Sequence, residues 1–122
     1  METSGNAVLK IYASSTDRIG SKLLYEYIVQ KANDCGLSGA TVYRGIMGYG
    51  QTSNINSAKF WELTEKLPVM IEIIDTDETL ENFYKLIEDD LHKMPKGCLV
   101  TIEPVTVKLQ KPGFTGGKVN KE

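Results

Sequence analysis

The chain has 122 residues, which is enough for one domain with its own hydrophobic core but not for two. Its net charge of −2 argues against a dedicated nucleic-acid binder, because such proteins carry a basic surplus that offsets phosphate repulsion. No apolar run approaches the roughly 20 residues of a membrane span, and the polar N-terminus lacks a signal-peptide pattern. Cys35 and Cys98 lack metal-ligand spacing, so we expect two free, buried thiols in a cytoplasmic protein rather than a disulfide.

The first third of the chain predicts a strand followed by an amphipathic helix. Residues 8–13 alternate around the apolar Leu9, Ile11 and Ala13, which is typical of a strand. We expect Ser21 to cap a helix that runs to about Asp34, and Gly36 to supply the left-handed residue that ends it. The apolar stripe of this helix would consist of Leu24, Ile28, Ala32 and Cys35.

A second strand, residues 40–47, leads into a long polar loop, residues 51–66. Glycines at 45, 48 and 50 indicate either a bulged strand or backbone amides that are exposed to an anion or a base. The spacing alone favours the bulge, because no Gly-Lys-Ser/Thr motif and no immediate helix follow the glycines. A strand that releases such a loop suggests regulation or ligand binding rather than catalysis.

The second half predicts a strand, a helix and a last strand. Residues 67–74 are strongly apolar, and residues 75–77, with the acidic Asp75 and Asp77, start a helix. A turn at residues 95–97 leads to a last strand, residues 98–109, which Pro104 interrupts. Because proline cannot donate to a ladder, we expect this strand at the edge of the sheet. The buried stripe of the helix would consist of Leu80, Phe83, Tyr84, Ile87 and Leu91.

The order β-α-β-β-α-β predicts an α+β, ferredoxin-like fold, in which two helices cover one face of a four-stranded antiparallel sheet. The first and third strands would be central, in agreement with their apolar character. Residues 7–110 form this domain, and residues 111–122 are expected to be a mobile C-terminal tail. The other face of the sheet is too apolar to stay in water, so we expect another subunit to cover it. This face would carry Lys10, Tyr12, Tyr43, Met70 and Ile74.

Two segments resemble a known family. They are Gly-Ala-Thr-Val-Tyr-Arg-Gly-Ile-Met-Gly-Tyr-Gly at residues 39–50 and Leu-Pro-Val-Met-Ile-Glu-Ile-Ile-Asp at residues 67–75. Both are similar to the PII-like family known as domain of unknown function 190, and the likeness covers about residues 8–110. That family in turn resembles the PII signalling proteins, which are ferredoxin-like trimers. PII proteins bind adenine nucleotides in clefts between subunits and regulate partners through a long loop.

The resemblance implies a ligand site. Residues 48–51 are similar to the base of the PII loop, and residues 95–97 fall where PII proteins hold phosphates. Where those proteins place a lysine after the glycine, this chain has Cys98, so AMP or ADP is easier to accommodate than ATP. No cofactor is required, and no metal site is expected. The expected ligand-binding residues are Arg44, Gly48, Tyr49, Gly50, Gln51, Glu72, Lys96, Gly97 and Lys108.

Several of these side chains have a structural alternative. Arg44 would either hold a phosphate with both nitrogens or pair with a carboxylate at a subunit surface. Glu72 needs a cationic partner, for which Lys96, Lys10 and Arg44 are candidates, and the pair would either close an empty site or serve only the fold. Lys96 and Lys108 would otherwise be ordinary solvated lysines.

These features predict signalling rather than catalysis. His92 suits the negative end of the second helix, and one histidine builds neither a Ser-His-Asp triad nor a zinc site with these companions. We expect a homotrimer that senses an adenine nucleotide and acts through the loop at residues 51–66. By analogy its partner would be a membrane transporter or channel, with no nucleic acid and no direct membrane insertion. The alternatives are a trimeric interaction module without a small ligand and, least favoured, a small enzyme that uses Glu72.

Overall fold

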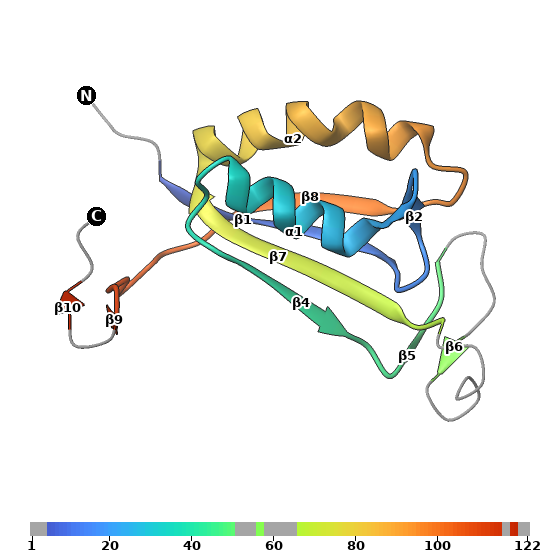
Figure 1. The fold of residues 1–122 in the computed structure, drawn as a ribbon, viewed down its shortest axis with the longest axis horizontal. Coiled ribbons are helices and arrows are strands. Elements are labelled where there is room, and N and C mark those ends of the chain that lie inside the picture. Colours follow the sequence, from blue (N-terminus) through green and yellow to red (C-terminus); the bar gives the residue numbers. More distant parts are fainter. Residues whose placement is uncertain (1–4, 51–55, 58–65, 116–117, 120–122) are drawn as a thin grey trace.

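The computed structural model describes residues 5–50, 56–57, 66–115 and 118–119. Its body is a four-stranded antiparallel sheet in the order β4-β7-β1-β8, with two helices against one face (Figure 1). Strands β1 and β7 are central and β8 lies at an edge, so the predicted ferredoxin-like fold is confirmed. The main elements are β1 (Asn6–Ser14), α1 (Leu24–Asp34), β4 (Ala40–Arg44), β7 (Pro68–Thr76), α2 (Asp77–Lys93) and β8 (Leu99–Pro104).

Among the described residues, three short antiparallel pairs accompany the sheet. They are β2 (Arg18–Ile19) with β3 (Lys22–Leu23), β5 (Met47–Gly48) with β6 (Asn56–Ser57), and β9 (Phe114–Thr115) with β10 (Lys118–Val119). The second pair closes the base of the long loop predicted after β4. The rest of that loop, residues 51–55 and 58–65, lies outside the described residues.

The core lies between the central strands and the helices. Alternation turns Leu9 and Ile11 of β1 and Ile71 and Ile73 of β7 toward the helices, where they have no exposed surface. They pack against the apolar stripes of α1 and α2 in one cluster. The predicted stripes are confirmed except at Cys35, which is exposed, and Tyr84, which is half-buried. Their buried members are Leu24, Ile28 and Ala32 in α1, and Leu80, Phe83, Ile87 and Leu91 in α2.

The sequence predicted the C-terminal end of α1 correctly but not its N-terminal end. Gly36 has a φ of 79°, and its backbone closes the helix in the left-handed conformation, as predicted. Ser21 does not cap the helix, so this prediction is wrong. The preceding residues form the β2–β3 hairpin, so α1 begins only at Leu24. Its N-cap residue is Leu23, which supplies no side-chain hydrogen bond.

Two further predictions need correction. The last strand ends at Pro104 instead of continuing to residue 109, because proline has no N–H for the ladder and the next residue, Val105, makes its hydrogen bond to Asn6 O at 3.0 Å outside the strand. Both cysteines are exposed rather than buried. Cys35 lies at the C-cap of α1 and Cys98 follows the turn after α2, so neither faces the core. Among the described residues, neither helix has the length and apolar character of a membrane span.

Candidate functional site

The helix-free face of the sheet carries three rows of side chains that run across the strands. We call it the open face. Its first row consists of Leu99, Tyr12, Met70 and Tyr43. Its second row consists of Thr101, Lys10, Glu72 and Thr41. Its third row consists of Glu103, Val8 and Ile74. All five residues predicted for this face therefore lie on it.

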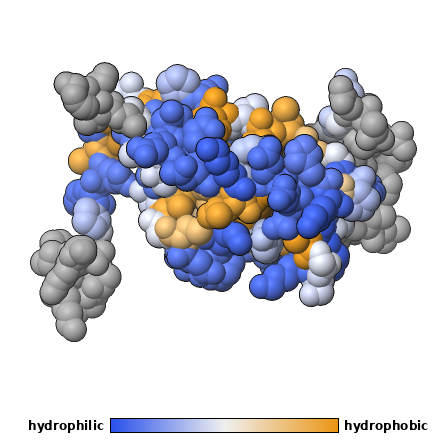
Figure 2. Space-filling model, turned by 90° about the horizontal axis from the view of Figure 1, so that it is seen from above, coloured by the Kyte–Doolittle hydropathy of each residue, from blue (hydrophilic) through white to orange (hydrophobic). Residues whose placement is uncertain are grey.

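The open face remains partly exposed in the single chain. Tyr43 is 48% exposed and Leu99 is 57% exposed, whereas the core side chains of the same sheet are near 0%. The helical side, by contrast, exposes mostly hydrophilic residues in the view from above (Figure 2). The open face is thus the broad surface of the sheet that the chain's own helices leave uncovered.

Glu72 lies in the middle row of the open face. The hydroxyl of Tyr43 donates to Glu72 Oε1 at 3.1 Å, and this bond raises the pKa of Tyr43 above its ordinary value. Lys10 stands opposite Glu72 in the register, but its Nζ pairs with Glu103 Oε2 at 3.5 Å. Of the three cationic partners predicted for Glu72, Lys10 lies beside it on the sheet, although its ion pair is with Glu103. Arg44 shares the alternation of Val42 and so belongs to the opposite face.

A hollow of about 310 Å³ adjoins Glu72 where β4 begins. Its lining includes Thr41, Glu72 and Gln110, whose side chains end in a hydroxyl, a carboxylate and an amide. Ser38 is fixed at its rim, because its N and Oγ donate to Asp75 Oδ2 at 3.0 and 3.1 Å. Such convergent polar groups in a concave surface can hold the edge of a small ligand. The lining residues are Ser38, Gly39, Ala40, Thr41, Glu72, Ile74 and Gln110.

The sequence reasoning found Glu72 but missed the other residues of this hollow. Residues 38–41 carry no motif of their own, and they precede the glycine-rich stretch that drew attention. Gln110 comes from the segment after β8, and the fold brings that segment beside the start of β4. The alternation of β4 could have placed Thr41 on the same face as Tyr43, although it could not have placed Gln110.

One close contact explains two of the glycines before the loop. Gly45 N donates to Pro68 O at 2.7 Å, which brings the backbone against the proline ring. A Cβ on Gly45 would lie 2.9 Å from Pro68 Cγ, and a Cβ on Gly48 would lie 3.2 Å from the same atom. Gly45 and Gly48 therefore have a packing reason that requires no ligand.

The predicted ligand residues do not all come together in one chain. One group lies at the end of the sheet where β1 and β4 finish and β8 starts, and it consists of Arg44, Gly48, Tyr49, Gly50, Lys96 and Gly97. Glu72 lies in the middle of the open face. Lys108 is exposed and lies at the opposite end, between Val105, which bonds to Asn6, and Gln110 in the hollow. Gln51 lies outside the described residues.

The comparisons with known proteins agree with this architecture. Residues 6–107 match the family profile of domain of unknown function 190, described as "Uncharacterized ACR". The chain belongs to this family. A UPF0166 protein of Aquifex aeolicus (strain VF5) is 38% identical over 100 residues, which are 82% of this chain and 90% of that relative. A UPF0166 protein of Methanocaldococcus jannaschii is 36% identical over 87 residues, 68% of this chain and 80% of that one.

The fold of this UPF0166 family member is similar to that of a PII protein. The crystal structure of Arabidopsis thaliana PII bound to citrate superposes with a TM-score of 0.54 and 14% sequence identity, covering 84% of this chain and 79% of the PII chain. At this identity the likeness concerns the fold alone. The family and the PII-like fold predicted from residues 39–50 and 67–75 are both confirmed.

Proposed function

We propose that this protein is a PII-like regulatory protein that binds AMP or ADP between its subunits. The observation that carries the proposal is the hollow of about 310 Å³ beside Glu72, on the open face of a PII-like fold. An adenine ring and a ribose present donors and acceptors in fixed directions. Glu72 can accept from an exocyclic amine or a hydroxyl, while Gln110 and the Thr41 hydroxyl can both donate and accept.

The distance between this hollow and the loop base supports a site that is shared between subunits. Thr41 lies in β4 and Gly48 in β5, and the seven positions between them span at most roughly 20 Å at about 3.3 Å per extended residue. A mononucleotide is shorter than this maximum span. We therefore propose that the nucleotide contacts the hollow of one subunit and the backbone at residues 48–51 of another. Arg44, Lys96 and Gly97 lie at the loop end and stay candidates for its phosphates.

The assembly that creates such clefts is proposed to be a homotrimer. The first row of the open face offers an apolar surface for another subunit. Lys10 and Glu72 of the second row, together with Glu103 of the third row, offer opposite charges that a second copy can complement. The proposed regulation is a population shift, in which the bound nucleotide favours one state of the loop at residues 51–66. A membrane transporter or channel is the proposed partner class, by analogy alone.

The test is the melting temperature of the protein with AMP, ADP and ATP, after light scattering has determined the mass of the assembly. A nucleotide at about 100 times its dissociation constant stabilises the folded state by about 2.7 kcal/mol. We therefore expect AMP or ADP to raise the melting temperature, and we expect Glu72→Gln to remove this shift. The variant keeps an acceptor for the Tyr43 hydroxyl, so we expect its fold to be retained.

Glu103→Gln is the matched control, because this carboxylate lies on the same face but does not line the hollow. An equal loss of the shift in both variants would assign the effect to charge rather than to the hollow. If no nucleotide changes the melting temperature of a folded trimer, the interaction module becomes the better account. Turnover of a nucleotide that Glu72→Gln abolishes would instead favour an enzyme.

A further inference from the structure

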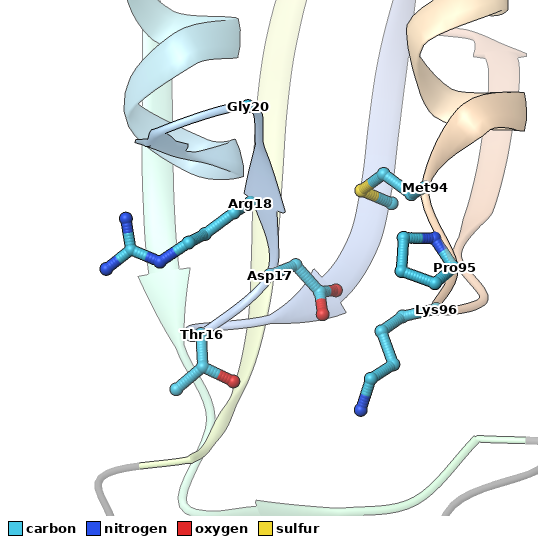
Figure 3. Close-up of a pocket in the computed structure, with 7 residues that line it drawn as sticks. All are labelled: Thr16, Asp17, Arg18, Gly20, Met94, Pro95 and Lys96. Carbon is cyan, nitrogen blue, oxygen red and sulfur yellow. The ribbon is translucent and has the colours of Figure 1, made fainter.

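A second hollow, of about 420 Å³, lies at the loop end of the sheet (Figure 3). It is formed by the connection from β1 to β2 on one side and by the turn after α2 on the other. It shares no lining residue with the hollow beside Glu72. Its lining residues are Thr16, Asp17, Arg18, Gly20, Met94, Pro95 and Lys96.

Asp17 places a buried negative charge at this hollow. Asp17 is only 6% exposed. Its backbone N–H donates to Ser14 O, and its carbonyl oxygen accepts from Leu24 N. Asp17 Oδ2 accepts from Ser14 N at 2.9 Å, but Oδ1 has no hydrogen-bond partner among the described residues. The carboxylate is directed toward the turn that carries Pro95 and Lys96 (Figure 3). Since a buried charge without a full set of partners is costly, this position favours a cationic ligand group.

Two cationic side chains line the same hollow, and neither neutralises Asp17. Arg18 Nη1 donates to Ser21 O at 3.0 Å, and its guanidinium points away from Asp17 (Figure 3). Lys96 lies across the hollow from Thr16 and forms no ion pair with any carboxylate of the described residues. A negative group and a positive group therefore border one cavity without being joined to each other.

We propose that this hollow binds a free amino acid. The α-ammonium group would donate to Asp17 Oδ1, and the α-carboxylate would accept from Lys96 Nζ, so that each charged end meets its opposite. Met94, which is 9% exposed, and Pro95 form an apolar wall that favours an aliphatic or aromatic side chain. The volume of about 420 Å³ lies within the range of small-molecule sites. This hollow is separate from the hollow beside Glu72, and Lys96 is the residue that it shares with the proposed phosphate contacts of the nucleotide.

Isothermal titration calorimetry of the full chain tests the proposal, with L-leucine, L-methionine and L-phenylalanine as probes. We expect saturable binding of at least one of them. N-acetyl-L-leucine lacks the ammonium group and 3-methylbutylamine lacks the carboxylate, so each should bind about tenfold more weakly than L-leucine, or worse. Binding of N-acetyl-L-leucine as tight as that of L-leucine would overturn the proposal, as would the absence of saturable heat with all three amino acids.

Two variants connect the binding to this hollow. Asp17→Asn keeps an oxygen acceptor for Ser14 N and removes the charge, and Lys96→Met removes the cation from an exposed turn. Each should weaken amino-acid binding about tenfold, while Lys93→Met, which does not line the hollow, should leave it unchanged. If Asp17→Asn does not fold, Lys96→Met decides. Unchanged binding in the folded variants would overturn the proposal, and an intact nucleotide shift in Asp17→Asn would keep the two sites distinct.

Discussion

The two faces of strand β7 differ in what covers them. Val69, Ile71 and Ile73 lie under the helices and are at most 4% exposed. Met70, Glu72 and Ile74 lie on the open face, where Ile74 is 38% exposed and Glu72 is bonded to a tyrosine of the next strand. The covered face is uniformly aliphatic, which holds the fold together. The open face mixes apolar, acidic and hydroxyl groups, which suits recognition of a ligand or of another copy.

The largest expected effect compares neighbouring residues of this strand. Ile71→Ala should lower the free energy of unfolding by about 3 kcal/mol, because it leaves a cavity among fully buried side chains. Urea denaturation at two protein concentrations measures it. The loss for Ile71→Ala should be independent of concentration, whereas that for Met70→Ala should shrink at the lower concentration, where the copies of the proposed assembly are dissociated in both proteins. Losses of equal size and equal concentration dependence would remove the distinction between the two faces.

A second effect is expected where β7 begins. Gly45→Ala should lower the free energy of unfolding by about 1–3 kcal/mol, because its Cβ would lie 2.9 Å from Pro68 Cγ. Gly48→Ala should cost less, since its contact is 3.2 Å. Thermal denaturation checks both, with Gly39→Ala as the control, because nothing lies within 4 Å of a Cβ there. Equal melting temperatures for all three variants would argue against the packing explanation of these glycines.

A smaller effect is expected on the helical side. Tyr27 OH donates to Asp90 Oδ2 at 2.6 Å and joins α1 to α2, so Tyr27→Phe should lower the free energy of unfolding by about 1 kcal/mol. This bond to Asp90 also raises the pKa of Tyr27 above its ordinary value of 10.0. Because the folded pKa exceeds the unfolded one, the contribution is complete below about pH 10 and is lost as the pH rises through the raised pKa.

Urea denaturation at neutral pH and in strongly alkaline buffer checks this sign. The difference between the wild-type protein and Tyr27→Phe should shrink as the pH rises above 10.0, where the tyrosine hydroxyl loses its proton. A difference that stays constant across this range would show that the effect of Tyr27→Phe is packing rather than the hydrogen bond.

The smallest effect is expected from the ion pair on the open face. The side chains of Lys10 and Glu103 are 25% and 57% exposed, so Lys10→Met should change the free energy of unfolding of the subunit by less than about 1 kcal/mol. Denaturation in low and high salt checks this value. If Lys10→Met instead lowers the free energy of unfolding much more and also lowers the mass of the assembly, the second row is buried between copies. The two faces of the sheet would then differ in being covered by another copy or by the helices.

Much of the fold follows from local patterns in the sequence. The alternation of β7 fixed which residues share a face, and the helical spacing in α2 selected Leu80, Phe83, Ile87 and Leu91 for the core. Glu72 was placed correctly on the face opposite Ile71 and Ile73 for the same reason. The left-handed Gly36 and the edge position of the strand with Pro104 were also predicted correctly, because both depend on the backbone chemistry of single residues.

Other features depend on contacts between distant segments, and the sequence could not supply them. Ser21 has the chemistry of a helix cap, but it lies within the hairpin in which Arg18 pairs with Leu23, so the helix begins after it. The face on which Arg44 lies relative to Glu72 depends on the register between β4 and β7, which no single strand encodes. Gln110 beside Thr41, and Lys96 across a hollow from Asp17, were likewise brought together by the tertiary structure. Local periodicity determined the elements and their faces, while the packing of those elements decided which polar groups share a cavity.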